Sequence, residues 1–211
     1  MKVSMIGTGN MARGIGTRLI SGGHDVVFIG RGANEAEEAV AAVKDAGSGA
    51  ASKGTMSDEL GEVVVLAVPF GANVDLVKEL GSRLAGKVVI DIANPLKPTF
   101  DGLATASDSS SAEEVAKAAV KEARVVKAFN TTFAGALMSG KAGGLPLDVF
   151  IAGDDESAKN TVSQLANDGG MRAVDVGPLA FSRYLEGIQF LHIALQGSLG
   201  TNWVSGLKIV S

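Results

Sequence analysis

The 211-residue sequence predicts an α/β protein built on a doubly wound, mostly parallel sheet. The continuous apolar run at residues 63–68 has the composition of a strand covered on both faces, and residues 87–92 read as another buried strand. Strand patterns alternate with helical patterns along most of the chain, an order typical of a parallel sheet flanked by helices. Residues 2–31 give the third indication, because they read as strand, glycine-rich turn, helix and strand.

The glycine-rich turn follows the first expected strand, residues 2–6, and leads into a helix. Gly7 permits a turn that a side chain would block, and Gly9 leaves room for a diphosphate to approach the backbone. The small Ala12 lets the helix pack closely on the strand. A helix N-terminus also offers unpaired N–H groups and a partial positive charge to phosphates. The pattern therefore predicts a Rossmann-type, dinucleotide-binding unit.

The end of the second expected strand, residues 26–29, indicates which dinucleotide binds. Enzymes that use NAD usually place an acid there for the ribose 2′-hydroxyl, whereas this chain has Gly30 and Arg31 and no acid before Glu35. A guanidinium can bind a 2′-phosphate with a charge-assisted hydrogen bond worth roughly 1.5–3 kcal/mol. We therefore predict NADP over NAD, with a solvated loop arginine as the alternative.

The composition excludes several classes of protein. A formal net charge of -4 shows no basic excess, so neither nucleic acid nor an anionic membrane is an expected partner. The absence of cysteine excludes disulfides and cysteine-bound metals, so any redox chemistry must belong to bound cofactors. With no apolar run of membrane-spanning length and no signal-peptide pattern, we expect a cytoplasmic protein.

The two histidines give no metal-ligand pattern. His24 and His192 lie far apart, and neither has a carboxylate at the spacing of a metal site. We expect His24 to be a turn residue, His192 to lie on a helix face, and the protein to hold no metal.

The remaining elements follow from apolar periodicity. The expected helices cover residues 34–46, 73–84, 112–122 and 157–166, and the further strands cover residues 63–68, 87–92, 149–152 and 173–176, with another strand starting at Arg124. Residues 47–54 and 140–146 are expected loops, the first with at most a short strand at 50–51.

Ser111 and Glu114 fit a capping box at the start of the expected helix at residues 112–122. Residues 97–111 read as a linker or a flap. We expect a nucleotide-binding domain at 1–178 and a helical segment at 179–211.

The strand at 63–68 ends at Val68 and is followed by Pro69 and Phe70. Ligands of doubly wound sheets lie beyond the carboxyl ends of the strands, so these residues should border the cofactor. The alternative is that Pro69 only ends the strand and Phe70 fills the core. Asn94 ends the next strand, where its amide could bind ribose or the nicotinamide carboxamide, or could simply form a turn before Pro95.

A second polar strand end lies at residues 130–131. The strand from Arg124 delivers Asn130 and Thr131 at its carboxyl end, and a helix begins near Thr132. Asn130 and the helix N–H groups should therefore face the cleft. The small Ala134, in the first turn of this helix, would let a flat ring approach.

The last segment, residues 179–203, reads as a long apolar helix with few charges. Arg183 and Glu186 lie near its start at helical spacing, and we expect an ordinary surface ion pair. Such an apolar helix suits a cover for the sheet or a contact with a second subunit. We predict a homodimer.

Five short motifs, followed by a short helical end, resemble the coenzyme F420-dependent NADP oxidoreductases over essentially the whole chain. These motifs are Gly7-Thr8-Gly9-Asn10-Met11, Gly30-Arg31, Val68-Pro69, Asn94-Pro95 and Lys127-Ala128-Phe129-Asn130-Thr131. The resemblance implies a Rossmann fold and hydride transfer between NADPH and a deazaflavin. It also implies NADP contacts at Thr8, Gly9, Asn10 and Met11, a 2′-phosphate site at Gly30 and Arg31, and further contacts at Phe70, Val74 and Ala134.

Two departures from that family bear on the expected chemistry. Members often carry a further basic residue after the matching arginine, where this chain has Gly32 and Glu35. Well-studied deazaflavin enzymes have His in the stretch that holds Asn130 here. The Asn version is similar to less characterised branches of the family and to the cytoplasmic domain of the transmembrane ferric reductases called STEAP, which leaves a flavin or another compound open as the electron acceptor.

The opening motif also resembles pyrroline-5-carboxylate reductase. Those enzymes continue into a large all-helical dimerisation domain, whereas strand patterns recur here at Val125, Val149 and Val174. The tail after Pro178 is too short for such a domain, and the same holds for hydroxyacid dehydrogenases.

The expected reaction needs no strong acid or base from the protein. Hydride transfer between two bound rings gains from their face-to-face placement in a dry cleft. The sequence offers no catalytic dyad, triad or metal site, so we name no catalytic residue. A module that binds or senses NADP(H) without turnover is the competing class.

Overall fold

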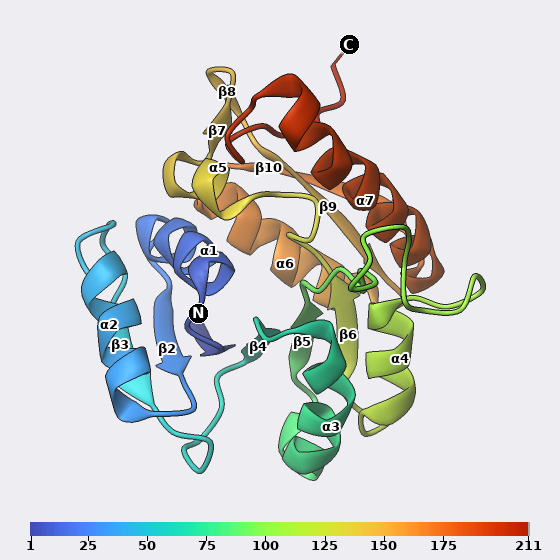
Figure 1. Ribbon diagram of the computed structural model, residues 1–211. Coiled ribbons are helices and arrows are strands. Elements are labelled where there is room, and N and C mark those ends of the chain that lie inside the picture. The colour runs from blue at the N-terminus through green and yellow to red at the C-terminus, as the bar shows by residue number, and fades with distance from the viewer. Residues whose placement is uncertain (211) are drawn as a thin grey trace.

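The structure is a computed structural model that describes residues 1–210 (Figure 1). One eight-stranded sheet forms its centre, in the order β10-β9-β6-β5-β4-β1-β2-β3. Neighbouring strands run parallel except β6 and β9, which are antiparallel. The strands are β1 (Lys2–Ile6), β2 (Asp25–Ile29), β3 (Ala51–Gly54), β4 (Val63–Leu66), β5 (Val88–Asp91), β6 (Arg124–Lys127), β9 (Asp148–Gly153) and β10 (Arg172–Gly177). The predicted doubly wound, mostly parallel sheet is confirmed.

Helices cover both faces of this sheet. They are α1 (Asn10–Ser21), α2 (Ala33–Val43), α3 (Phe70–Leu80), α4 (Ser111–Ala118), α5 (Ala134–Ser139), α6 (Glu156–Asp168) and α7 (Ser182–Leu199). Buried residues of α1, α2, α5 and α6 share one core cluster, and those of α3 and α4 share another. Alternate residues of β9 face opposite sides, so Val149 belongs to the first cluster while Phe150 packs with Leu185 of α7. Within residues 1–210, no helix is both long and apolar enough for a bilayer crossing.

The direction in which successive strands are added to the sheet changes at β1, and the expected ligand site lies at this switch point. β1 pairs with β2 on one side and with β4 on the other. The crossover connections therefore leave in opposite directions, and a crevice opens beyond the carboxyl ends of β1 and β4. Gly7, the residue after β1, has φ +119°, and a Cβ there would lie 2.1 Å from the Ala67 carbonyl oxygen. Only glycine fits between these two strand ends.

Two predicted loops contain strands. β3 lies at the edge of the sheet beside β2, although its sequence, Ala-Ser-Lys-Gly, is not strand-like. Asp25 fixes this register, because its carboxylate accepts from the Ala50 N–H at 3.0 Å. The second expected loop contains a small hairpin of β7 (Lys141–Ala142) and β8 (Leu145–Pro146), turned by Gly143 and Gly144 at positive φ.

Two helix starts differ from the sequence-based expectation. α4 is capped by Ser110, whose hydroxyl accepts from the Glu113 N–H and donates to the Glu113 carboxylate. The capping box is therefore one residue earlier than the predicted pair, and Ser111 is the first helical residue. α3 begins at Phe70 rather than at residue 73, because Pro69 occupies the position before the first helical turn.

Candidate functional site

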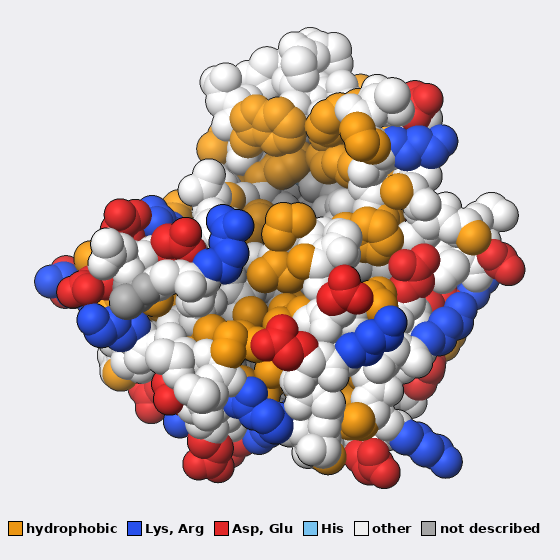
Figure 2. Space-filling model, turned by 60° about the horizontal axis from the view of Figure 1, so that its bottom comes forward, with side chains coloured by type: hydrophobic (Ala, Val, Ile, Leu, Met, Phe, Trp, Pro, Cys, Tyr) orange, Lys and Arg blue, Asp and Glu red, His pale blue; other side chains and the backbone are white. Residues whose placement is uncertain are grey.

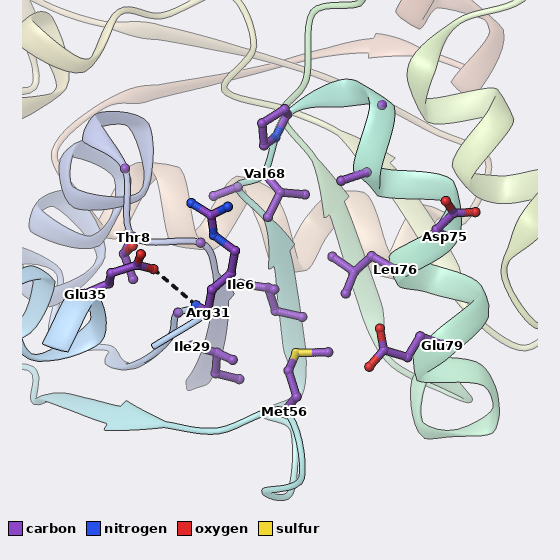
Figure 3. A pocket seen from close by; sticks show the side chains of 17 residues that line it. Ile6, Thr8, Ile29, Arg31, Glu35, Met56, Val68, Asp75, Leu76 and Glu79 are labelled. Carbon is purple, nitrogen blue, oxygen red and sulfur yellow. Dashed lines mark hydrogen bonds between the residues drawn. The ribbon is translucent and has the colours of Figure 1, made fainter. Parts of the chain in front are cut away.

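A cavity of about 890 Å³ lies at the carboxyl ends of β1, β2 and β4 (Figure 3). Strand ends, the glycine turn and the exposed side of α3 form its walls. On the face drawn in Figure 2, hydrophobic side chains gather in a central hollow, with charged side chains of both signs around it. Of the predicted site residues, the cavity is lined by Thr8, Gly9, Gly30, Arg31, Val68 and Pro69.

The glycine turn presents the N-terminus of α1 to this cavity. Gly9 is the N-cap of α1 and, having no side chain, leaves the first N–H groups of the helix uncapped. A Cβ built on Gly9 would meet nothing within 4 Å, so the space above the turn is open. The first turn of α1 carries no acidic residue. These features fit a diphosphate, which needs backbone donors, a positive helix end and close approach.

Asn10 and Met11 lie beside the turn without lining the cavity. They are the first two residues of α1, Asn10 exposed and Met11 half-buried. Arg13 holds the turn from the helix side, since its Nε donates to the Thr8 carbonyl at 3.0 Å. The site residues of the turn are thus Thr8 and Gly9 by contact with the cavity, and Asn10 by position at the helix end.

Arg31 lies where β2 ends and points its guanidinium into the cavity beside the glycine turn (Figure 3). Its side chain is exposed, and within the described residues no carboxylate lies within ion-pair distance of it. Gly30 lines the cavity beside it. A cation in this position can bind a phosphate on the adenosine ribose.

On the opposite wall, α3 presents a different face from the one predicted. Val68 and Pro69 line the cavity, followed by Gly71, Ala72, Asp75, Leu76 and Glu79 at helical spacing. Phe70 and Val74 lie half-buried on the flank of α3, outside the cavity lining. The helix buries Asn73, Val77 and Leu80, and this orientation turns Phe70 and Val74 away from the cavity.

The asparagines at the next two strand ends bind each other. Asn94, after β5, donates from Nδ2 to the Asn130 carbonyl at 2.9 Å, and Asn130, after β6, donates from Nδ2 to the Asn94 Oδ1 at 3.0 Å. Phe129 precedes Asn130 with φ 63°, a backbone conformation that non-glycine residues rarely adopt. The pair closes the strand ends and lies outside the cavity lining.

Ala134, which also lies outside the cavity lining, is the first residue of α5, and the C-terminal segment covers the next position. A Cβ on Gly135 would lie 2.9 Å from the Trp203 carbonyl oxygen and 3.0 Å from Val204 Cγ1. Phe133, just before α5, packs against His192 and Trp203 with ring centroids 4.5 and 5.3 Å apart. The start of α5 is therefore covered by the tail on one side.

A buried ionic cluster beside these strand ends was missed by the sequence analysis. Lys127, at the end of β6, donates to Asp91 at 2.8 Å and to Glu186 at 2.6 Å, and all three side chains have no exposed surface. Asn73 of α3 donates to the second Asp91 oxygen at 2.9 Å, and the Ser111 N–H donates to Glu186 at 3.0 Å. The cluster therefore links β5 and β6 to α3, α4 and α7.

Burial raises the pKa of Glu186 to about 7, although Lys127 opposes this shift. Asp91 adds to the rise because it shares the same ammonium group. Two carboxylates and one lysine leave a formal excess of one negative charge in a fully buried place, which a proton on Glu186 removes. Within the described part of the chain, no group of three or more acids and histidines is arranged to hold a metal ion.

The expected surface pair of Arg183 and Glu186 is wrong. Arg183 donates instead to Glu113 of α4 at 2.8 Å, and Glu186 points into the cluster. The reason is that α7 packs its polar side inward. The buried residues of α7 are Ser182, Leu185, Glu186, Gln189, His192 and Gln196, all on one helical face. The sequence shows the helical spacing of these residues, but the polarity of most of them predicts that this face of α7 is exposed to solvent.

Both histidines have defined partners. His192, expected on a helix face, is buried and bonds Gln189 at 3.1 Å and Ser205 at 2.8 Å. His24, expected in a turn, is buried just before β2 and lies 3.2 Å from Asp168. Burial lowers the pKa of each ring. Neither ring lies in the cavity.

Comparisons with known proteins match this architecture. The family model described as "NADP oxidoreductase coenzyme F420-dependent" matches residues 2–95. The F420-dependent NADP reductase of Methanocaldococcus jannaschii is 32% identical over 213 residues, covering 92% of each chain. The metalloreductase STEAP3 of Rattus norvegicus is 32% identical over 89% of this chain, which corresponds to 36% of STEAP3.

Solved structures agree with the sequence matches. A chain from Arthrobacter sp. FB24, named as a candidate F420-dependent NADP reductase, superposes with a TM-score of 0.86 at 27% identity over 100% of both chains. A pyrroline-5-carboxylate reductase from Coxiella burnetii gives a TM-score of 0.59 at 20% identity, covering 94% of this chain and 70% of the other. The second likeness concerns the fold alone.

Proposed function

This chain belongs to the family of coenzyme F420-dependent NADP oxidoreductases, and from that premise we propose that it transfers hydride between NADP(H) and a deazaflavin of the coenzyme F420 type. The observation that carries the proposal is the match to an F420-dependent NADP reductase over 92% of both chains, together with the cleft at the switch point of the sheet. The match to this family supports the proposed reaction, and the cavity at the switch point supports the proposed dinucleotide site.

The residues of the cleft suit NADP. The uncapped N-terminus of α1 and the open space above Gly9 would receive the diphosphate, and Thr8 borders that space. Arg31 would bind the adenosine 2′-phosphate through charge-assisted hydrogen bonds. Val68 and Pro69 would limit the site on the α3 side. Asn10, Met11, Phe70, Val74, Asn94, Asn130 and Ala134 remain proposed contacts for the rest of the two cofactors.

When bound together, the nicotinamide and the deazaflavin exchange a hydride between their rings, and the protein needs no covalent step. The task of the chain is then to bind, orient and exclude water. The Asn94–Asn130 pair fixes the strand ends beside the cleft. Phe133, the N-cap of α5, and Leu137 within this helix are both buried and hold the start of α5 in place. No residue of this chain is proposed as an acid, base or nucleophile.

The test is the oxidation of NADPH followed at 340 nm with the purified protein. Coenzyme F420, FMN, FAD and a ferric chelate would be offered separately, because the match to STEAP3 leaves other acceptors to be compared. We expect the fastest oxidation with coenzyme F420. Tight NADPH binding without oxidation by any acceptor would instead support a binding or sensing module. Oxidation by flavins alone would show that the acceptor is a flavin and that coenzyme F420 is the wrong assignment.

A homodimer in the cytoplasm is also part of the proposal. The outward face of α7 carries exposed apolar residues at helical spacing: Tyr184, Ile188, Leu191, Leu195 and Leu199. Apolar stripes of this kind are usually covered by a partner, and a second copy would pair α7 with itself. Light scattering at micromolar concentration should give a dimer mass, and Leu191→Glu should give a monomer. A monomer mass for the parent protein would contradict the proposed homodimer. Cell fractionation would test the proposed cytoplasmic location.

A further inference from the structure

The charges around the cavity are unusual for a site that takes a phosphorylated adenosine. Among the described residues that line it, Arg31 is the one cation, and Glu35, Asp75 and Glu79 are carboxylates. Asp75 and Glu79 project from α3 on the far wall, whereas Glu35 lies beside Arg31 on the near wall (Figure 3). Only Glu35 therefore shares the place where the 2′ substituent of the adenosine ribose would lie.

Glu35 binds a backbone donor beside the Arg31 side chain. It is the third residue of α2, and its Oε2 accepts from the Arg31 backbone N–H at 3.3 Å. The N-cap of α2 is Gly32, which has no side chain to cap the helix. The carboxylate thus binds one of the backbone donors next to the guanidinium that the 2′-phosphate needs.

We propose that Glu35 is the residue that sets the preference between NADPH and NADH, and that it keeps this preference small. The inference rests on the proposed function, because it concerns the same dinucleotide site. A carboxylate beside Arg31 repels a 2′-phosphate and competes for its donors. The same carboxylate can accept a hydrogen bond from a ribose 2′-hydroxyl, as the acid at this strand end does in NAD enzymes. The wild-type site therefore takes both coenzymes.

A purely structural role for Glu35 makes a different prediction. If Glu35 only caps α2, then Gln, whose amide oxygen can still accept from the Arg31 N–H, should leave both affinities unchanged. If Glu35 sets the preference, Glu35→Gln removes the charge while the cap remains. This substitution separates the two roles without removing the side chain.

The experiment measures dissociation constants for NADPH and NADH by calorimetry at low salt, without any acceptor. Glu35→Gln should tighten NADPH about tenfold and weaken NADH several-fold, because one charge-assisted interaction is worth about one decade. Glu37→Gln is the matched control, since Glu37 lies on the same helix, pairs with Lys53 and does not line the cavity. It should change both constants less than about twofold.

The ratio of the dissociation constants for NADPH and NADH tests whether Glu35 sets the preference between the two coenzymes. If Glu35→Gln shifts NADPH and NADH equally, or no more than Glu37→Gln does, the carboxylate has no role in the preference and the inference is wrong. If the parent protein and both variants bind neither coenzyme, the proposed function itself fails, and this inference fails with it. The first failure leaves a working dinucleotide site, so the two are distinguishable.

Discussion

Two neighbouring parts of one sheet edge are built in opposite ways. Beyond β1, β2 and β4, the chain leaves an open cavity bounded by backbone donors and a single exposed cation, Arg31. At the ends of β5 and β6, Lys127 is fully buried and bonded to two fully buried carboxyl groups, those of Asp91 and Glu186. The first region leaves its guanidinium free for a ligand. The second pairs its lysine with carboxyl groups of the protein, and these contacts attach α7.

The difference predicts where mutations will act. Changes in the open region should alter coenzyme affinity with little effect on folding, because its side chains contribute few contacts to the core. Changes in the buried cluster should alter stability, because an unpaired charge without solvent is costly. Four substitutions test this division, in order of expected size.

Lys127→Met should have the largest effect. It leaves Asp91 and Glu186 buried without their shared cation, and breaking a buried pair in this way typically costs about 3–5 kcal/mol. Urea unfolding at neutral pH would measure the change. Lys117→Met, at an exposed position of α4, is the control and should stay within about 0.5 kcal/mol. A loss of less than about 1 kcal/mol for Lys127→Met would mean that the cluster does not hold α7 in place.

Glu186→Gln should change how stability depends on pH. The pKa of Glu186 is 4.5 in an unfolded chain and about 7 in the folded protein, so the folded state holds its proton more tightly. The protonated Glu186 side chain therefore contributes fully to the free energy of unfolding below pH 4.5, and this contribution is lost as the pH rises from 4.5 through 7. The parent protein should lose about 1.4 kcal/mol per pH unit in this window relative to Glu186→Gln.

Unfolding curves of both proteins between pH 4.5 and 8 would check this. The comparison between the two proteins cancels the titration of His24 and His192, which both retain. Parallel stability profiles would show that Glu186 stays ionised beside Lys127 throughout, contrary to the expected proton on the buried cluster.

Arg31→Ala should act on binding alone. Removing the guanidinium should weaken NADPH about tenfold or more, since a charge-assisted hydrogen bond contributes about 1.5–3 kcal/mol. NADH, which lacks the phosphate, should be nearly unaffected. Calorimetry with both coenzymes would measure this, and unfolding should be unchanged because the side chain is exposed. Equal losses for both coenzymes would contradict the 2′-phosphate role.

Gly9→Ala should have only a small effect on stability. Gly9 has φ −71°, which alanine adopts easily, and its Cβ would meet nothing within 4 Å. The free energy of unfolding should change by no more than about 0.5–1 kcal/mol, because the entropy that alanine removes from the unfolded chain is opposed by its weaker preference for the N-cap position. Both coenzymes should bind more weakly, because the methyl group enters the space left for the diphosphate. Unchanged binding of both would place the diphosphate elsewhere.

Most of the sheet could be predicted because its strands are locally encoded. β4 is Val-Val-Val-Leu and β5 opens with Val-Val-Ile, and β-branched runs of this kind are typical of strands covered on both faces. β3 could not be predicted in the same way, since its polar residues form a strand only through pairing with β2. The cap of α4 was displaced by one residue because Ser110 and Ser111 both follow the capping pattern.

The candidate site divides along the same line. Gly7 and Gly9 identify the turn because a glycine requirement is a property of the local backbone. The asparagine pair was predicted only as two separate strand ends, since their mutual bonds depend on the order of β5 and β6 in the sheet. Phe70 and Val74 were predicted to lie in the site but lie on the flank of α3, because the buried face at Asn73, Val77 and Leu80 sets which side of the helix faces the cavity.

The sequence by itself determined the fold class, the glycine turn and the cation at the end of β2, because each depends on residues close together in the chain. Only the tertiary structure decided the inward face of α7 and the partners of Lys127. Those partners, Asp91 and Glu186, lie 36 and 59 positions away. Polarity alone assigns such charges to the surface, and only burial beside an opposite charge reverses that assignment.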